Sequence, residues 1–566
     1  MSKSAKPQSL LSSQTFQIAA MLFIIALMPR LMGIGWGLPN SLHNHSYHPD
    51  EHLNWLVSRH VSPLQGQFLP GYYNYGTLYF SLMRIAGDFA AAYSGGAPSG
   101  NAAMDPAFVA KCILAGRFLN VIFGSLAASV VFLLMRRWTG KAGSIFAGLV
   151  IAFAPGLVMH SDFATVDMLS FLLFVLSAHF ALKLIPAEGE TPLTEKQQWK
   201  WVLLSAACAG LSASAKYPGI LAFGTLAAVL LYAAKPKAVQ FGGAGFLVAL
   251  VAFILGTPAA LLDRDKFVQG LTDEIVHSRT GHDLVFAGTA PGWIYHLSNL
   301  FQGVGILITL LGLSGLIYGC LQRKTWLICL TVSFVLTYLA IGGSEVKFLR
   351  YTFPLDLAIA AGSGWMVGLG HLQKGRSLIL VAIGILGLGG LDAGGFRAAM
   401  ENSAIMAAPE ARDRGALYIK QQYAGKSIGV VTDPWYYTPP IYPDTGMLRA
   451  PWPIQEQAIK AAQGLTVVRY VPANPDERQE WDPRLITEYK PDAIVFSNFE
   501  TDARERFLRN GAPAGSEGEL KKYQEFKRLL ESQYQLDRAF GIDPGPIVQD
   551  MMYVRPYIQI WKRKPA

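Results

Sequence analysis

Residues 201–234 read WVLLSAACAGLSASAKYPGILAFGTLAAVLLYAA, a long apolar run in which Lys216 is the only charged side chain. A membrane-spanning helix needs about 20 apolar residues, so this run is too long for one crossing and long enough for two short ones. A single helix here would also leave Lys216 deep in lipid, which is costly. We therefore expect two spanning helices, 201–214 and 218–234, with the chain turning back at Lys216.

Apolar runs of the same kind occur along the first two thirds of the chain. Of the 566 residues, 51% are hydrophobic and 15% are charged, and the mean hydropathy is +0.29. An average soluble domain carries roughly 25% charged residues, so this composition excludes an ordinary soluble protein and a disordered chain. We expect a polytopic α-helical membrane protein with about 11 transmembrane helices. The other nine runs lie near 16–33, 116–135, 143–159, 167–185, 239–261, 297–320, 326–342, 351–370 and 377–391.

Charged residues gather in the last third of the chain. Residues 393–566 hold 23 Lys or Arg and 22 Asp or Glu, against 25 and 17 in residues 1–392. We expect residues 1–392 to form a transmembrane domain and residues 393–566 a soluble, extracytoplasmic α/β domain. The four cysteines show no C-x-x-C spacing, so neither a zinc site nor a disulfide framework is indicated. The α/β prediction rests on strand-like and helical stretches at 427–432, 493–497, 557–561 and 520–534.

The basic residues predict how the chain crosses the membrane, because short Lys- and Arg-rich loops face the cytoplasm. With eleven crossings, all the basic clusters fall on the side of the N-terminal tail. We expect a multi-pass protein of the bacterial inner (plasma) membrane with a cytoplasmic N-terminus, and with loops 35–115 and 262–296 outside. The basic residues of the cytoplasmic loops then explain the pI of about 9.1, and no nucleic acid partner is expected. The clusters lie at 136–141, 183–200, 235–237, 323–324 and 374–376.

The first outer loop contains His48-Pro49-Asp50-Glu51. Proline at the first helical position followed by acids is typical of a helix start, and that interpretation needs no function. A carboxylate fixed at a helix start just above the membrane is also well placed as a general base. Five of the eleven histidines lie in this loop, but no known zinc spacing is present. We therefore assign no metal ligand, while a requirement for a divalent cation stays open.

Other charged residues lie at the ends of predicted helices on the same outer face. Asp162 and Asp167 stand at one helix start, and Lys216 occupies the turn described above. Arg350 and Tyr351 precede a late helix. Singly, the acids are explained as helix caps and the cations as lipid-headgroup contacts. Together these carboxylates and cations suit an anionic phosphate and a hydroxyl that must lose its proton.

Five short motifs are His48–Glu51, Tyr72–Tyr79, His160–Asp167, Gly210–Tyr217 and Arg350–Pro354. They resemble motifs of the protein O-mannosyltransferase and aminoarabinose transferase-like enzymes. These are phospholipid-carrier-dependent glycosyltransferases of the GT-C superfamily. The likeness covers roughly the first 370 residues, and each motif falls where the predicted topology requires it. The C-terminal domain resembles the family in its placement alone.

The resemblance implies an inverting glycosyltransferase with a sugar donor linked to a polyprenyl phosphate. The acceptor is a lipid, glycan or protein hydroxyl, and the sugar is a hexose or a pentose. In this interpretation Asp50 is the general base, Glu51 positions the acceptor or a cation, and Asp167 orients the sugar or acceptor. Lys216 and Arg350 hold the phosphate, while Asp162 is an alternative to Asp167. The other expected substrate-binding residues are His48, Tyr72, Tyr73, His282 and Tyr351.

Two other classes of function fit a membrane protein of this kind. A transporter or flippase of an anionic or lipid-linked substrate also places charges at membrane depth, usually near the midplane between inverted repeats. No such repeat is visible, and the charges here gather at one face. A scaffolding membrane protein with an outer binding domain needs no such cluster. A groove that joins Asp50, Lys216 and Arg350 would disfavour both alternatives.

Overall fold

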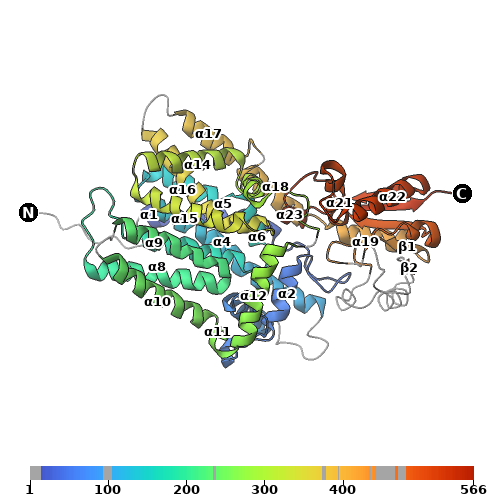
Figure 1. Ribbon diagram of the computed structural model, residues 1–566, viewed down its shortest axis with the longest axis horizontal. Helices are drawn as coiled ribbons and strands as arrows, with labels where there is room; N and C mark the ends of the chain where they lie inside the picture. The colour runs from blue at the N-terminus through green and yellow to red at the C-terminus, as the bar shows by residue number, and fades with distance from the viewer. Residues whose placement is uncertain are drawn as a thin grey trace, which may run out of the picture.

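The computed structural model describes residues 14–93, 105–233, 237–282, 284–372, 378–392, 394–432, 435–441, 466–468 and 480–565. It has a large helical part and a smaller part built on a β-sheet (Figure 1). The helical part extends to α17 (Leu378–Gly389), and the sheet occupies the C-terminal third. The predicted domain boundary at 392/393 stays a prediction. Directly after it, α18 (Gly395–Ala407) packs against helices of the large part.

The helical part contains several helices that are apolar enough to cross a membrane. In the described part of the chain, four single helices meet the length and composition of a span, and two bent pairs bring the number to six. Three shorter apolar stretches, α7 (Asp167–Leu182), 217–232 and α17, add to these. The protein is therefore a multi-pass membrane protein, as expected, and the count of eleven crossings stays a prediction. The four helices are α1 (Gln14–Gly33), α4 (Pro106–Met135), α10 (Ala238–Gly256) and α15 (Thr325–Gly342); the pairs are α5 (Gly140–Ala152) with α6 (Pro155–Ser161) and α13 (Gly292–Gly303) with α14 (Ile306–Leu321).

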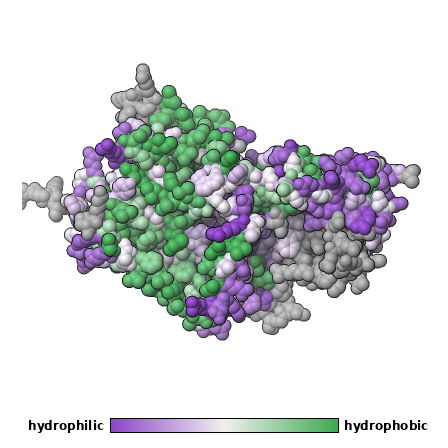
Figure 2. Space-filling view, viewed as in Figure 1, coloured by the Kyte–Doolittle hydropathy of each residue, from purple (hydrophilic) through white to green (hydrophobic). Residues whose placement is uncertain are grey.

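The surface of the helical part is mostly hydrophobic, and that of the C-terminal part is mostly hydrophilic (Figure 2). Large apolar side chains stand exposed on the spanning helices; Leu255 on α10, for example, is 74% exposed. Contiguous apolar surface of this extent is unfavourable in water. Lipid therefore covers the helical part.

The chain reverses at Lys216, as the sequence predicts. α8 (Glu195–Ala215) ends where Lys216 takes an extended backbone, and the 3-10 helix η4 (Tyr217–Ala222) and α9 (Phe223–Ala233) follow. On α7, Ser177 Oγ lies 3.2 Å from Ser205 Oγ and 3.5 Å from the carbonyl oxygen of Ala222. Residues before and after the turn thus lie at the same level of α7, so α8 and α9 form a hairpin.

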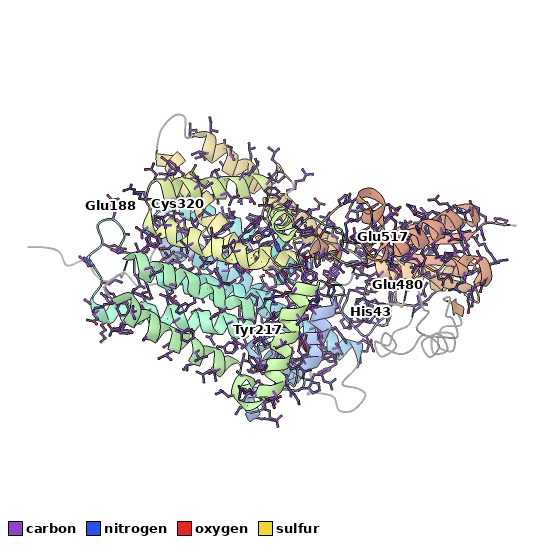
Figure 3. All side chains as sticks on the ribbon, viewed as in Figure 1. His43, Glu188, Tyr217, Cys320, Glu480 and Glu517 are labelled. Carbon is purple, nitrogen blue, oxygen red and sulfur yellow. The ribbon has the colours of Figure 1, made fainter. Side chains whose placement is uncertain are left out.

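Three of the predicted cytoplasmic loops lie at the same end of the molecule. Arg137 pairs with Glu190, and Lys237 Nζ lies 2.8 Å from Glu195 Oε1, so ion pairs join the three loops. Glu188 lies at this end, farthest from the C-terminal part (Figure 3). Two further parts of the basic clusters, residues 235–236 and 374–376, lie outside the described residues. The arrangement agrees with the predicted topology, whose orientation in the membrane stays a prediction.

The C-terminal part is a five-stranded sheet with helices on both faces, which confirms the predicted α/β character. The strand order is β2-β1-β3-β5-β4, with β1 parallel to β2 and β3, and β5 antiparallel to β3 and β4. α19 (Ala411–Gln422) contacts β4 and β5, while α21 (Asn498–Asn510) and α22 (Glu517–Gln533) pack together over β3 and β4. The predicted helix 520–534 ends one residue early, because Tyr534 already begins a strand. The strands are β1 (Ser427–Val430), β2 (Thr466–Val468), β3 (Ala493–Ser497), β4 (Tyr534–Phe540) and β5 (Ile558–Arg563).

The remaining described helices complete the chain. They carry many of the polar residues described below. They are α2 (Pro49–Ser58), η2 (Pro63–Gln65), α3 (Leu78–Tyr93), α11 (Ala259–Leu262), α12 (Arg264–Thr280), η6 (Leu349–Thr352), α16 (Phe353–Leu372), η9 (Leu485–Tyr489) and α23 (Gln549–Met552).

Candidate active site

The helix α2 presents the two neighbouring acids of the first long loop in different surroundings. Pro49 stands at the first helical position and both acids lie in the first turn, where they face the positive end of the helix dipole. The side chain of Asp50 is 31% exposed, whereas that of Glu51 is fully buried. Of these two acids, Asp50 is therefore the one that a molecule from outside can reach.

Glu51 is held in a buried, two-pronged ion pair. Arg117 on α4 donates from Nε to Oε1 at 2.6 Å and from Nη2 to Oε2 at 2.7 Å. The backbone N–H of Ala164 and the hydroxyl of Ser46 also donate to this carboxylate. Burial would raise the pKa of Glu51, but Arg117 and the other donors hold it below its ordinary value. The pair fastens α2 to α4.

Arg350 lies at the centre of the polar cluster. Its Nη2 donates to Oδ2 of Asp50 at 3.1 Å, and its Nη1 donates to Oδ1 of Asp550 at 3.0 Å. Phe348 lies beneath the guanidinium, 3.9 Å from ring centroid to Cζ. Asp50 and Asp550 stand 300 and 200 residues away in sequence, so the fold brings three distant segments together here.

Asp550 on α23 is a fully buried carboxylate with three contacts. Besides Arg350, the backbone N–H of Leu349 donates to its Oδ2 at 2.7 Å, and His160 Nε2 lies 3.1 Å from its Oδ1. Burial would raise the pKa of Asp550, but Arg350 and His160 hold it well below its ordinary value. A charge from the C-terminal part is thus built into the cluster.

His48 lies buried beside this cluster. Its ring packs on Phe163 and Tyr553, with centroid separations of 4.4 and 4.8 Å. Burial lowers the pKa of His48 to about 4 in spite of the nearby Asp50, so the ring is neutral at pH 7. Neither ring nitrogen is hydrogen-bonded to any described residue. His48 therefore contributes packing and a neutral polar edge to the site.

Lys216 and Asp167 form a second ion pair close by. Lys216 Nζ donates to Asp167 Oδ1 at 2.6 Å, and the ammonium lies 4.6 Å from the ring centroid of Tyr351. These three side chains and Arg350 line a cavity of about 370 Å³. Most of its other lining residues are apolar, and it extends between η4, α12, α15 and α16. The cavity thus has an apolar body and a charged end.

Two residues near the charged end add acidic and phenolic groups. Glu274 on α12 lines the cavity, and burial raises its pKa against the pull of Lys216. Tyr72 is half-buried, and burial, with Asp50 and Glu274 nearby, raises the pKa of its hydroxyl. Tyr72 therefore stays a neutral hydrogen-bonding group at the side of Asp50.

Asp162 and Asp167 are separated by the fold. Asp167 lines the cavity, whereas Asp162 is fully buried and is absent from its lining. Neither carboxyl oxygen of Asp162 is hydrogen-bonded to a described residue, and Arg117 and Arg30 are its nearest opposite charges. Burial raises the pKa of Asp162 well above its ordinary value. Of the two acids, Asp167 has the position that a substrate requires.

Neither Tyr73 nor His282 lines this cavity. Tyr73 is buried against Phe267, and its hydroxyl donates to Asp263 Oδ2 at 2.8 Å. His282 contacts His277 and helps to line a separate cavity of about 100 Å³ that also includes Pro49. The structure thus gives Tyr73 a packing position and places His282 near Pro49, at the start of α2.

The chemistry of the donor set does not define a metal site. Among the described residues, no group of three or more His, Cys, Asp or Glu side chains is placed to hold a metal ion. The carboxylates of the cluster are instead bonded to Arg350 and Lys216. A requirement for a divalent cation stays an open prediction.

Sequence reasoning missed Arg117, Glu274 and Asp550. Arg117 had a usable signal, because an ionisable residue inside an apolar run is a functional or structural candidate. Glu274 lies on a polar helix in a long loop, where an acidic residue is common and gives no functional signal. Asp550 follows no periodicity and belongs to no motif, so its place in the site emerges from the tertiary fold alone.

Part of the chain matches a known protein family. Residues 99–262 match the family described as dolichyl-phosphate-mannose-protein mannosyltransferase. The matched segment contains Asp162, Asp167 and Lys216. The match confirms the resemblance to GT-C glycosyltransferases that the motifs predict. No curated protein matches the chain.

Several solved structures are similar to the chain. ArnT from Cupriavidus metallidurans in the apo state shares 13% identity over 97% of this chain and 98% of its own, with a TM-score of 0.48. The oligosaccharyltransferase AglB from Archaeoglobus fulgidus shares 14% identity over 97% of this chain and 78% of its own, with a TM-score of 0.47. The Pmt1–Pmt2 complex of S. cerevisiae shares 13% identity over 46% of this chain and 35% of its own, with a TM-score of 0.33.

Proposed function

We propose that the chain is an integral-membrane inverting glycosyltransferase of the bacterial inner membrane. It moves a hexose or pentose from a polyprenyl-phosphate donor to a hydroxyl of a lipid, glycan or protein on the extracytoplasmic side. The observation that carries the proposal is the cavity of about 370 Å³, whose lining is mostly apolar and includes the charged residues Lys216, Asp167 and Arg350. Such a cavity suits a prenyl chain attached to a phosphate.

The two cations keep hydrogen-bonding capacity for a phosphate. A lysine ammonium has three N–H donors, and Asp167 takes one of those of Lys216. Arginine has five, and the contacts of Arg350 with Asp50 and Asp550 use two of them. A phosphate that enters the cavity can therefore bind both cations without displacing the carboxylates. The positive charges then stabilise the negative charge that develops as the phosphate leaves.

Asp50 is the general base in this proposal. The acceptor oxygen attacks the anomeric carbon as the bond from that carbon to the lipid phosphate breaks, so the configuration inverts. The acceptor proton passes to Asp50, and the bonding electron pair leaves with the phosphate. Arg350 holds one oxygen of Asp50 and fixes the direction of the carboxylate. Glu51, being buried and paired, positions α2, while Asp167 orients the sugar or the acceptor.

A reconstituted assay distinguishes transfer from transport. Purified protein is placed in proteoliposomes with undecaprenyl phosphate carrying a radiolabelled sugar, and a cell-envelope extract supplies the acceptor. We expect the label to move to the extract and free undecaprenyl phosphate to accumulate. If the label crosses the bilayer while it stays on the lipid, the transporter hypothesis is correct. If the donor is neither consumed nor moved, a glycosyltransferase function with this carrier is refuted.

A further inference from the structure

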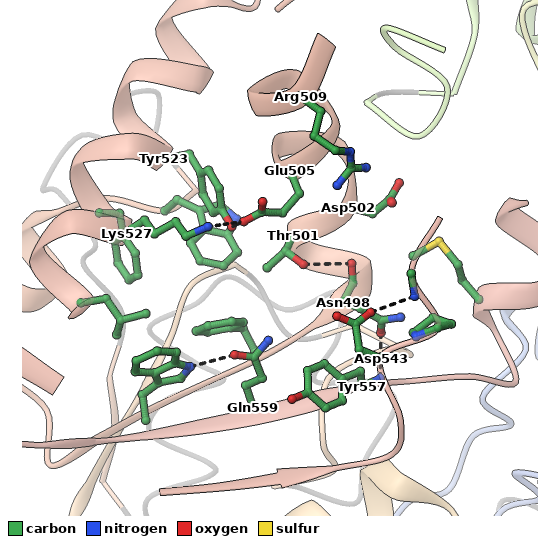
Figure 4. A pocket seen from close by; sticks show the side chains of 18 of the residues that line it. Asn498, Thr501, Asp502, Glu505, Arg509, Tyr523, Lys527, Asp543, Tyr557 and Gln559 are labelled. Atoms are coloured by element: carbon green, nitrogen blue, oxygen red, sulfur yellow. Dashed lines mark hydrogen bonds and ion pairs between the residues drawn. The ribbon is translucent and has the colours of Figure 1, made fainter. Parts of the chain in front are cut away.

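A second cavity, of about 350 Å³, lies within the C-terminal part of the chain (Figure 4). The strand β5 forms one wall, and the helices α21 and α22 form the other. Small-molecule sites commonly have volumes from about 300 Å³ upward, so the cavity is large enough for a small ligand or one end of a longer one. The proposed transfer reaction makes no use of it.

Alternate side chains of β5 and of the residue before it form the first wall of the cavity. Ile558 and Ile560 are buried, whereas Tyr557, Gln559 and Trp561 are half-exposed on the opposite face of the strand. An aromatic ring, an amide and a second aromatic ring therefore follow one another along the cavity. Trp561 Nε1 donates to Gln559 Oε1 at 3.0 Å, which fixes the orientation of the amide.

A charged triad on the two helices builds the opposite wall. Glu505 Oε1 accepts from Tyr523 Oη at 2.7 Å and from Lys527 Nζ at 2.8 Å. Both bonds converge on the same oxygen, so Glu505 Oε2 takes part in neither. Figure 4 shows this triad across the cavity from Gln559 and Tyr557, with Thr501 beside it. Fixed acceptors and donors thus face the aromatic wall.

The charge of the lining discriminates among ligand classes. Four carboxylates and two cations line the cavity, a net charge of −2. An anionic ligand such as a phosphate or a nucleotide would meet net repulsion here. A ligand with apolar faces and a hydroxyl-rich edge meets two aromatic rings and preoriented hydrogen-bonding groups. Tyrosine and tryptophan suit such ligands, because each combines a flat apolar body with a polar tip.

We propose that this cavity is a binding site for a neutral saccharide, with a sugar ring against Trp561 and Tyr557 and hydroxyl groups bonded to Gln559 and Glu505. The proposal concerns binding alone and holds whether or not the chain transfers a sugar. The site adjoins the charged cluster through α23. Met552 on that helix lines the saccharide cavity, and Asp550 two residues earlier contacts Arg350.

Binding of the full-length protein to an array of immobilised oligosaccharides tests the proposal. The array carries neutral glucans, mannans, galactans, arabinans and chito-oligosaccharides beside phosphorylated and sialylated glycans, and no lipid-linked donor is present. We expect binding to at least one neutral class. The Gln559→Ala and Glu505→Gln variants should each bind about tenfold more weakly, the equivalent of about 1.4 kcal/mol for a lost hydrogen bond.

Gln535→Ala is the matched control, because Gln535 is an exposed glutamine on β4 and does not line the cavity. Its binding should equal that of the unmodified protein. Variants at Gln559 and Glu505 are preferred to removal of Trp561, whose loss would also disturb packing. Three results would overturn the proposal: no binding to any neutral glycan, binding confined to the acidic glycans, or neutral-glycan binding that both test variants retain in full.

Discussion

Replacement of Asp550 by asparagine should weaken the site and the fold together. The carboxylate is fully buried and accepts from Arg350 Nη1 at 3.0 Å and from the Leu349 backbone N–H at 2.7 Å, with His160 Nε2 a further 3.1 Å contact to the oxygen that faces Arg350. Asparagine has a single acceptor oxygen, so one of the two donors loses its partner. A hydrogen bond that involves a charged group contributes about 1.5–3 kcal/mol, and this is the expected loss of stability.

The effect of the Asp550→Asn change should depend on pH. The pKa of Asp550 is held well below its ordinary value in the folded protein, against a value of about 3.9 in an unfolded chain. The stabilisation by its charge is therefore complete above roughly pH 5 and declines as the pH falls towards the lower, folded pKa. The variant lacks this contribution. The difference in melting temperature between the two proteins should stay constant from pH 5 to 8 and shrink below about pH 4.

Thermal unfolding of the purified full-length protein, followed by tryptophan fluorescence, measures this difference. Asp88→Asn is the control, because Asp88 forms an exposed pair with Arg84 and such pairs contribute about 1 kcal/mol or less. Equal melting temperatures for the Asp550→Asn variant and the unmodified protein at pH 7 would refute the reasoning. A difference at pH 3 as large as that at pH 7 would refute the assigned charge.

Four further predictions concern the site and the topology. Asp50→Asn should reduce sugar transfer by roughly 10²–10⁴-fold while donor binding persists, and unchanged turnover would remove Asp50 as the base. Lys216→Met should raise the donor concentration for half-maximal rate by roughly 10- to 150-fold, and an unchanged value would leave Lys216 as a headgroup contact. Glu51→Gln should lower stability by about 3–5 kcal/mol in thermal unfolding, since it leaves a buried guanidinium unpaired; a loss of transfer at normal stability would instead favour a catalytic role. An impermeant thiol reagent on intact spheroplasts should label a cysteine at Ser516 and spare one at Arg323, and the opposite pattern would invert the topology.

The sequence predicted those parts of the site that depend on local patterns. Asp167 and Lys216 stand at helix ends, and the positive-inside rule places both ends on one face, where the structure shows them paired at 2.6 Å. The helix start at Pro49 follows from local preferences and placed Asp50 correctly at the first turn. These features involve short segments, in which spacing and residue type carry the information.

Other parts depend on tertiary contacts that no local pattern encodes. The resemblance assigns different roles to the neighbours Asp50 and Glu51, but their different accessibility, with Glu51 buried by Arg117 and Asp50 exposed, is visible in the fold alone. The alternatives Asp162 and Asp167 were separated in the same way, by the shape of the cavity. The saccharide cavity joins a strand to two helices that end 25 or more residues earlier, and no sequence motif marks it.

The position of Asp550 also has a consequence for biosynthesis. All the apolar helices are translated before Asp550, so the membrane part can be inserted while this carboxylate is still on the ribosome. Until α23 docks, Arg350 has Asp50 as its acidic partner and the backbone N–H of Leu349 lacks the oxygen that later receives it. The charged cluster therefore reaches its final form after the C-terminal part has folded against the helices. Maturation of this protein is thus coupled to the folding of the segment that carries α23, and a nascent chain arrested before that point carries an incomplete site.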